Sequence, residues 1–429
     1  MIEIRERIII QDDWDTALRN ANDKIWIGLK KHGSKTIYGE LKMKENVIDE
    51  TIENVEIEKK LHSNHQSIFS ARLLKNRQIN VSCNVKKQKI DGDDDKDGGR
   101  DDDDDGGSSD ESRINLTFKA PDQIFQKVHS SWKTINCLDV TNGGLGVSCD
   151  SEGNVRIWLC EDGEVRRELK GHCGEVYTSK FFPSGLVVLT GGADTQLKIW
   201  SAEDGKCAAT LKGHRQGVTD TAIVDRGRNV VSASRDGTVK LWDCSQSQCL
   251  HTFDWLDSGP INACYLMGSW SGLAIAPPAL CISDKEVLTE GKILLVATER
   301  NKLSCLALHN KQHIFTYNTN SACNGCTRVS EYDVLVGCDD STLHLVDVRR
   351  ASSAVRILQE SRSKVLAMLS HGAGCFISTS DGSCFYADEC LKTGQEFTAP
   401  DSIFTMSGDG RYLYTGCRDG LIRRYKVGF

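Results

Sequence analysis

The sequence is short of proline and of long apolar runs, and both shortages restrict what the protein can be. It has 6 prolines among 429 residues, against 38 glycines and 39% hydrophobic residues, a mixture typical of a β protein rich in turns. No apolar run approaches the roughly 20 residues needed to cross a bilayer, so we expect no membrane partner. The opening MIEIRERIII has acidic residues within its apolar stretch and no small-residue cleavage site, so we expect no secretory signal.

The cysteines also lack a pattern, since all 18 are scattered without paired spacings. Many lie inside strand-like segments, and together with the missing signal this indicates reduced thiols that fill small apolar spaces. We therefore expect a protein of the cytoplasm or nucleus. The single CxxC, Cys323 to Cys326, has no second pair at zinc-finger spacing. No P-loop, dinucleotide or HExxH motif is present, so no metal and no cofactor is expected.

Negative charge is concentrated in one segment. Residues 91–112 contain eleven Asp and one Glu against one Lys and one Arg, a net charge of −10, which leaves +3 of the total −7 for the rest of the chain. The segment has no large apolar residue, so we expect a disordered acidic linker over residues 89–112. The remainder is nearly neutral and has no basic stripe interleaved with aromatic residues, so no nucleic-acid partner is expected.

After this segment the chain repeats at a constant period. Trp158, Trp200 and Trp242 are 42 residues apart, and each GH pair, at His172 and His214, precedes its tryptophan by 28 residues. Four short strands with their turns need about 40 residues, and the repeats are β-branched with Gly/Asp turns, so the period predicts propeller blades and excludes helical solenoids. Weaker markers continue the register at Leu306, Val346, Ala387 and Tyr425.

The repeats number seven, so the expected fold is all-β, a seven-bladed WD-repeat β-propeller over residues 113–429. Residues 1–88 combine strand-like alternation with one short helical segment, DDWDTALRNA, and predict a small, mostly-β N-terminal domain. The last repeat has no residues left for its outer strand. Because INLTFKAPDQIF after the linker resembles QEFTAPDSIF between two blades, we expect residues 113–120 to supply the closing strand of the last blade.

The two best repeats share four residues at fixed spacing. A hydroxyl residue lies ten positions before each tryptophan and an Asp six before it, which gives His172, Thr190, Asp194 and Trp200, then His214, Ser232, Asp236 and Trp242. A His-hydroxyl-Asp set could serve a hydrolase, but a catalytic triad occurs once and does not recur with a structural repeat. We expect hydrogen-bonded chains from indole to hydroxyl to imidazole to carboxylate, and no enzyme activity.

The other repeats match this set of four residues less completely. In the first repeat Glu152 stands at the Asp position and Ser130 at the His position, and the repeats at 306, 346 and 387 lack the tryptophan. Blades with incomplete sets must rely on apolar packing. We therefore expect the second and third blades to be the most rigid.

Three stretches closely resemble one known family: FFPSGLVVLTGGADTQLKIWSAEDGKC, TAIVDRGRNVVSASRDGTVKLWDC and the terminal CRDGLIRRY. They resemble the proteasomal ATPase-associated factors, WD-repeat chaperones of the proteasome regulatory particle. The resemblance covers most of the chain, weakens over residues 245–330 and leaves out the acidic segment. It implies a non-catalytic chaperone, a monomer by itself, that binds the C-terminal domain of a regulatory ATPase, chiefly of the regulatory subunit 8 type. Such a chaperone assists base assembly and hinders premature docking on the core particle.

Propeller geometry indicates where such a partner would bind, because loops gather on two faces and carry binding residues. On the face with the GH pairs and tight turns, the residue before each turn Asp should point outward, and residues after the GH pairs should line the same rim. The candidates are Glu175, Tyr177, Thr219, Arg235, Glu299, Asp339 and Arg418. Each is equally compatible with an ordinary solvated turn residue. We also expect the acidic linker to steer basic partners electrostatically.

Two other binding functions remain open. Substrate receptors of cullin-type ubiquitin ligases are also propellers, and they resemble one another in a WDxR box. Here Trp242-Asp243 is followed by Cys244 and Ser245, whereas the segment VDVR that ends at Arg349 keeps Asp and Arg without the aromatic residue. Neither box is complete. The second alternative is a generic WD-repeat scaffold with an unrelated partner.

Overall fold

The computed structural model divides the chain into two compact units, one of Met1–Arg5 with Lys119–Phe429 and one of Glu6–Phe118. The expected acidic linker lies outside the described residues except for its last two positions. No described helix has the length and apolarity needed to span a membrane. The structure describes residues 2–19, 24–30, 36–42, 68–74, 77–86, 111–254, 259–269, 283–360 and 362–427.

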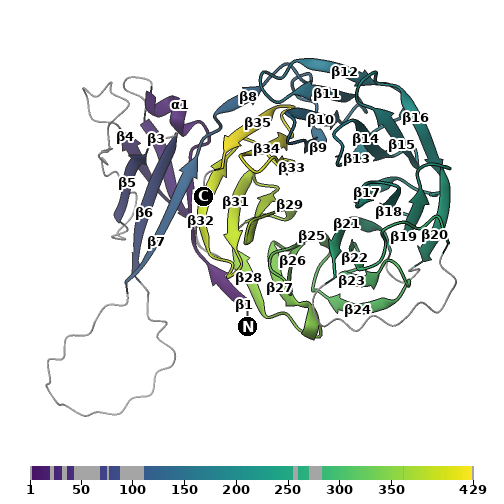
Figure 1. The fold of residues 1–429 in the computed structure, drawn as a ribbon. Helices are drawn as coiled ribbons and strands as arrows, with labels where there is room; N and C mark the ends of the chain where they lie inside the picture. Colours follow the sequence, from purple (N-terminus) through teal and green to yellow (C-terminus); the bar gives the residue numbers. More distant parts are fainter. Residues whose placement is uncertain are drawn as a thin grey trace, which may run out of the picture. The chain divides into compact units, whose positions relative to one another are not determined.

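Within the described residues, the larger unit is a closed ring of seven blades, each built on antiparallel strands (Figure 1). Consecutive strands of a blade pair with one another, from an inner strand at the centre of the ring to an outer strand. Blade one consists of β9 (Ile135–Val140), β10 (Leu145–Asp150), β11 (Val155–Leu159) and β12 (Val165–Leu169). Blade two consists of β13 (Val176–Phe181), β14 (Val187–Gly192), β15 (Gln196–Ser201) and β16 (Cys207–Lys212). Blade three consists of β17 (Val218–Val224), β18 (Asn229–Ser234), β19 (Thr238–Asp243) and β20 (Gln248–Asp254).

The remaining blades follow the same order. Blade four consists of β21 (Ile261–Gly268), β22 (Lys292–Thr298), β23 (Lys302–Ala307) and β24 (His313–Asn318). Blade five consists of β25 (Cys323–Arg328), β26 (Asp333–Cys338), β27 (Thr342–Asp347) and β28 (Arg356–Glu360), with the short 3-10 helix η2 (Val348–Arg350) after β27. Blade six contains β29 (Val365–His371), β30 (Gly374–Thr379), β31 (Ser383–Asp388) and β32 (Thr393–Thr398). Blade seven contains β33 (Ile403–Gly408), β34 (Tyr412–Cys417) and β35 (Ile422–Lys426).

The core of the ring lies between neighbouring blades, so the middle strands are covered on both faces. Every residue of β18 is buried, and Val230 packs in one cluster with Leu197 and Leu211 of blade two. Burial on both faces explains why these strands read as continuous runs of β-branched residues. The described cysteines are free thiols and most are buried. Burial raises the pKa of Cys160 to about 12, which favours an unreactive thiol.

Blade seven closes the ring against blade one. The hydroxyl of Ser407 on β33 donates to Asp139 Oδ1 at 2.9 Å and accepts from the backbone N of Val140 at 3.1 Å, both on β9. The outer strand of blade seven is β8 (Gln123–Phe125), which pairs with β35 through Ile422 and Phe125. An early segment of the chain therefore completes the last blade and covers the edge of its third strand.

The prediction that residues 113–120 close the last blade is wrong. The strand that closes it, β8, begins three residues after the end of the predicted segment. Residues 113–119 belong to β7 (Glu111–Lys119), which lies beside β6 (Gln78–Lys86) in the smaller unit. Two side-chain contacts support this register: Asn80 Nδ2 donates to Thr117 Oγ1 at 3.0 Å, and Arg113 Nη2 donates to Ser82 Oγ at 3.1 Å. The local likeness to QEFTAPDSIF therefore does not predict which strand this segment pairs with.

The first residues of the chain also lie outside their expected domain. The strand β1 (Ile2–Arg5) pairs in parallel with β28, Ile2 opposite Ile357, and adds a fifth strand to blade five. Arg5 Nη1 donates to the carbonyl O of Leu391 at 2.6 Å. The expected N-terminal domain of residues 1–88 thus loses its first strand to the propeller and gains β7.

The smaller unit is mostly β, as expected from its alternating pattern. One sheet contains β2 (Arg7–Ile10), β3 (Lys24–Lys30) and β4 (Ile37–Lys42), and β5 (Ile68–Leu74) pairs with β6. The helix α1 (Trp14–Arg19) buries Trp14, and Arg77 Nη2 pairs with Asp15 Oδ2 at 2.5 Å. The helix packs against β3 of the first sheet.

Candidate partner-binding face

In the part of the chain that the structure describes, every blade has a tight turn between its second and third strands, and all seven turns lie on one face of the ring. The inner strands all run in the same direction, so equivalent turns meet on the same side. Each turn contains a residue with φ between 58° and 84°, namely Gly153, Thr195, Gly237, Asn301, Ser341, Gly382 and Gly420. Glycine adopts this backbone without steric strain, whereas the three other residue types do so at a cost.

Two positions before that residue, a backbone N–H donates to a carbonyl O at the start of the same blade, at 2.8–3.0 Å. Seven equivalent hydrogen bonds show that these positions share one geometry. Four of the seven are predicted candidates, and the side chains of all four are exposed. The seven donors are Ser151, Ala193, Arg235, Glu299, Asp339, Ser380 and Arg418.

Arg235 is seated on an aromatic ring of the neighbouring blade. Its Cζ lies 5.5 Å from the ring centroid of Tyr177, which comes from β13 of blade two. Burial and the nearby carboxylate of Glu175 raise the pKa of Tyr177, while Arg235 opposes them. Glu175 itself is exposed. A Cβ on Gly217 would lie 3.1 Å from Tyr177 Cε2, so the glycine leaves room for this ring. Three predicted residues therefore meet at the junction of blades two and three.

The charged candidates in blades five and seven have partners of opposite charge. Asp339 Oδ1 lies 3.8 Å from Lys364 Nζ, and Arg418 Nε lies 3.0 Å from Asp401 Oδ1. These are exposed pairs, which contribute little to stability and can exchange for a partner's charges. Glu299 is exposed at the equivalent turn of blade four. The face thus presents both signs of charge.

Thr219 has a different environment from the other candidates. Its Oγ1 lies 2.8 Å from the carbonyl O of Ile261 and 3.3 Å from that of Ala233. Its hydroxyl therefore links blade three to blade four and is engaged within the ring. The sequence could not show this, because Ile261 belongs to another repeat.

The two predicted polar sets form continuous hydrogen-bonded chains. In blade two, Trp200 Nε1 donates to Thr190 Oγ1 at 2.8 Å, Thr190 lies 2.7 Å from His172 Nε2, and His172 Nδ1 lies 2.8 Å from Asp194 Oδ2. Burial lowers the pKa of His172, although Asp194 opposes this effect. A Cβ on Gly171 would lie 3.2 Å from the ring of Trp200, which explains the glycine of the GH pair.

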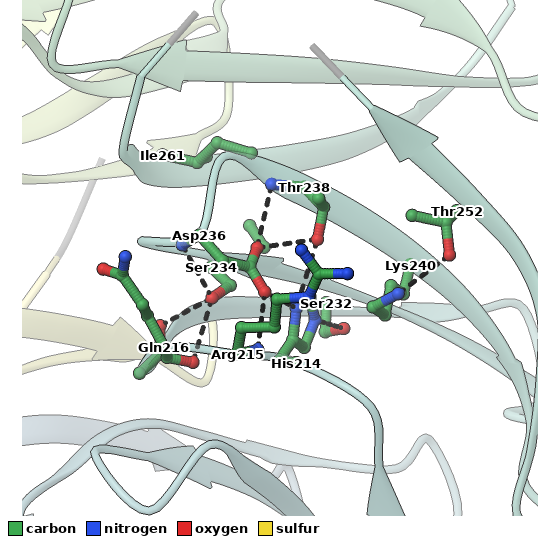
Figure 2. A network of polar contacts seen from close by, with 12 residues as sticks. His214, Arg215, Gln216, Ser232, Ser234, Asp236, Thr238, Lys240, Thr252 and Ile261 are labelled. Atoms are coloured by element: carbon green, nitrogen blue, oxygen red, sulfur yellow. Dashed lines mark hydrogen bonds and ion pairs between the residues drawn. The ribbon is translucent and has the colours of Figure 1, made fainter. Parts of the chain in front are cut away.

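Blade three repeats this geometry, and Figure 2 shows the hydrogen bonds that Asp236 accepts. Trp242 Nε1 donates to Ser232 Oγ at 2.8 Å, and His214 bridges Ser232 at 2.7 Å and Asp236 at 2.9 Å. Asp236 also accepts from Thr238 Oγ1 at 2.7 Å. Burial acts to raise the pKa of Asp236, but these hydrogen bonds outweigh it and lower that pKa. Because Ser232 is fully buried, a substrate could not reach this hydroxyl without opening the blade.

Blade one has a complete chain as well, so the prediction that Ser130 and Glu152 leave it incomplete is wrong. His129 Nε2 lies 2.7 Å from Ser148 Oγ, and His129 Nδ1 lies 3.1 Å from Asp150 Oδ2. Trp158 Nε1 donates to Ser148 Oγ at 3.0 Å. The histidine lies 29 positions before the tryptophan and the Asp eight before it, so a search at spacings of 28 and six misses both.

Blades five and seven hold their turns with other buried polar groups. In blade five, His344 lies 2.7 Å from the hydroxyl of Tyr317 in blade four and 2.9 Å from Thr342 Oγ1. In blade seven, Arg423 donates through both Nη atoms to Asp419. These residues lie outside the fixed spacings, so the repeat pattern does not predict them. The sequence feature that could have identified them is a His or Arg four positions after the Asp of the tight turn.

The comparisons with known proteins agree with this architecture. The family model for the WD domain, G-beta repeat, matches residues 163–201, 205–243 and 389–426. The chain is similar to Proteasomal ATPase-associated factor 1 of Homo sapiens, at 38% identity over 422 residues, 97% of this chain and 98% of the relative. The protein of that name from Gallus gallus is 38% identical over 423 residues, 98% of each chain.

More distant relatives cover the chain to a comparable extent. The Probable proteasomal ATPase-associated factor 1 of Dictyostelium discoideum is 32% identical over 444 residues, covering 97% of this chain and 95% of the relative. Among solved structures, the WD40 beta propeller domain of Doa1 aligns with a TM-score of 0.58 and 17% identity, over 72% of this chain and 97% of that domain. The structural likeness concerns the fold alone, and it confirms the all-β propeller.

Proposed function

Because the chain belongs to the proteasomal ATPase-associated factor 1 family, we propose that it is a non-catalytic binding protein for the C-terminal domain of one proteasomal regulatory ATPase, of the regulatory subunit 8 type. Binding would assist assembly of the base and hinder premature docking on the core particle. The names of the relatives and their coverage of 97% of the chain support a partner of this class.

The observation that carries the proposal is the face of the ring that bears the seven tight turns, called the seven-turn face from here on. Seven equivalent backbone hydrogen bonds hold the turns in one geometry, so the exposed side chains of Arg235, Glu299, Asp339 and Arg418 project from a rigid scaffold. A preorganised surface loses little conformational entropy on binding. Charges of both signs favour selection of one ATPase among similar ones, because a mismatched charge is penalised.

Within this face, Arg235 is the residue best placed to meet a partner. Its guanidinium is exposed and lies over Tyr177, in reach of solvent at the junction of two blades. Arginine held on an aromatic ring is typical of binding hot spots. We infer that the partner domain presents a carboxylate to Arg235.

The absence of catalysis is part of the proposal. The His-hydroxyl-Asp chains of blades one to three recur with the structural repeat, and their hydroxyls are buried. The mechanism we propose is therefore steric occlusion by one bound face, with no bond made or broken.

The test is calorimetry of the full chain with the separate C-terminal domains of all six regulatory ATPases, at two salt concentrations. We expect one selective partner with one-to-one stoichiometry. Arg235→Ala should weaken binding about tenfold at low salt and less at high salt, because salt screens a charge contact at the surface. Arg166→Ala is the matched control, since Arg166 is exposed on the outer strand β12.

If the folded chain binds none of the six domains, the proposal is contradicted. Binding to the adaptor protein of a cullin-type ubiquitin ligase would then be tested. The structure adds no observation in favour of that alternative. Arg349 of the incomplete box pairs with Asp347 at 2.7 Å and lies 4.1 Å from the ring centroid of Tyr332, so its guanidinium is engaged within its own blade.

A further inference from the structure

One exposed aromatic residue on the seven-turn face has no role in the fold described so far. Trp132 lies in the connection that enters blade one, next to the tight turn of blade seven. Its side chain is 82% exposed, the highest fraction among the large hydrophobic side chains that the structure describes. Its φ is 70°, in the left-handed region where a bulky residue is strained. The backbone there would suit glycine, and most of the indole is in water.

The connection that carries Trp132 is longer than its equivalents. The carbonyl that accepts the turn N–H comes three residues after the histidine in blades two and three, at Glu175 and Gly217. In blade one it comes five residues after the histidine, at Thr134, counted from His129. Blade one therefore has two extra residues between the histidine and the strand, and Trp132 lies within this insertion.

The insertion is held in place by hydrogen bonds. His129, at its start, is buried and both ring nitrogens are engaged in the polar chain of blade one. The backbone N of Trp132 donates to the carbonyl O of Asp419 at 2.8 Å. A Cβ on Gly420 would lie 2.8 Å from the carbonyl O of Ser130, so the loop packs closely on the turn of blade seven. The indole is thus displayed by a fixed backbone.

The charges around Trp132 compensate one another. Lys133 pairs with Glu152, and Arg418 pairs with Asp401 at 3.0 Å. The charged residues next to Trp132 in sequence and next to the adjacent turn of blade seven are therefore paired with opposite charges. A surface of this kind fits an apolar pocket with a polar rim, which is the arrangement found at hot spots.

We propose that Trp132 is the apolar anchor of the partner-binding face and that its indole inserts into an apolar pocket of the partner protein domain. The inference rests on the proposed function, since the partner is the same ATPase C-terminal domain. A rigid tryptophan buries a large area with little loss of conformational entropy. Nothing in the sets of repeated residues accounts for a strained, exposed indole at this position.

The test is calorimetry with the ATPase C-terminal domain that binds the full chain, at the two salt concentrations used for Arg235→Ala. Trp132→Gly should weaken binding at least tenfold at both salt concentrations, because the contact is apolar. Its melting temperature should not fall, since glycine relieves the strain at φ 70°. Trp132→Phe should retain part of the affinity.

Leu186→Ala is the matched control. Leu186 is 63% exposed and lies in the turn between β13 and β14, on the opposite face, so its binding should equal that of the unmodified chain. Unchanged binding of Trp132→Gly, beside an unmodified chain that binds, would overturn the inference and leave the proposed function standing. A melting temperature lowered in both Trp132 variants would instead assign the residue a structural role. If the unmodified chain binds none of the six domains, both proposals fail together.

Discussion

At the scale of single residues, the hydrogen-bonded chains of blades one to three form wherever the four side chains come close in space, even when their spacing along the sequence differs. Blade one reaches the same chain of indole, hydroxyl, imidazole and carboxylate with Asp150 at the end of β10 in place of an Asp in the turn. Each contact needs two polar atoms within about 3 Å, and more than one spacing along the chain can meet that need. Three consecutive blades therefore each contain a buried chain of this kind, which weakens the expectation that blades two and three are uniquely rigid.

His129→Ala should lower the free energy of unfolding by about 2 kcal/mol, because it leaves the buried Ser148 and Asp150 without their partner. Urea denaturation followed by fluorescence would measure the loss. The control is Ser130→Ala at the neighbouring, exposed position, which should change stability by less than about 0.5 kcal/mol. Equal effects of the two substitutions would restore the assignment based on spacing.

The carboxyl of Asp150 predicts how stability depends on pH. Burial acts to raise the pKa of Asp150, but hydrogen bonds from His129 and Asn154 outweigh it and bring that pKa from 3.8 to about 2. A lowered folded pKa means that the stabilisation is complete above pH 3.8 and is lost as the pH falls toward 2, by about 2.5 kcal/mol at most. Asp150→Asn should flatten the unfolding free energy between pH 4 and 2. A slope unchanged by the substitution would contradict this assignment.

At the scale of elements, the ring depends on a strand of only three residues. β8 completes blade seven, and its Phe125 is buried with ring centroids 5.1 Å from Trp158 and 6.4 Å from Tyr414. Asp122, just before β8, pairs with Arg424 of β35 at 2.9 Å. Side-chain anchoring on both sides compensates for the small number of backbone hydrogen bonds in this short strand.

Phe125→Ala should destabilise the propeller by about 3–4 kcal/mol, since it removes a buried aromatic side chain and leaves a cavity. Ile124→Ala is the adjacent control, because Ile124 is 43% exposed, and it should cost less than about 1 kcal/mol. Thermal and urea unfolding of both variants would show the difference. Comparable losses would mean that β8 contributes through its backbone alone.

At the scale of the whole molecule, charge is divided between the acidic segment and the rest of the chain. Residues 91–112 carry −10 and the remainder +3, while the seven-turn face presents both signs. A dense negative segment attached to a folded binder would raise the rate at which basic partners arrive and would do so most at low salt.

Replacing the eleven Asp of that segment by Ser keeps its length and removes most of its charge. The association rate with the ATPase domain should fall severalfold at low salt, and its salt dependence should weaken, while the dissociation rate stays the same. Stopped-flow measurements at several salt concentrations would report both rates. An unchanged association rate and salt slope would show that the segment does not steer the partner.

The class of fold, the period of the blades and the hydrogen-bonded chains of blades two and three were predictable from the sequence. These features repeat at a constant interval, so each copy supports the others. The exposed positions of the turns followed from the same period. Such features can be predicted because equivalent positions of the blades pack in the same way and therefore carry similar residues.

The pairing of segments that are distant along the chain was not predictable in this way, because it depends on tertiary contacts. Among the residues that the structure describes, three such features each occur once: the pairing of Ile2 with Ile357, the pairing of Phe125 with Ile422 and the two-residue insertion around Trp132. A sheet edge accepts any strand through its backbone hydrogen bonds, so local sequence does not distinguish one edge from another. The choice depends on side chains contributed by remote blades, and these meet only when the ring has closed.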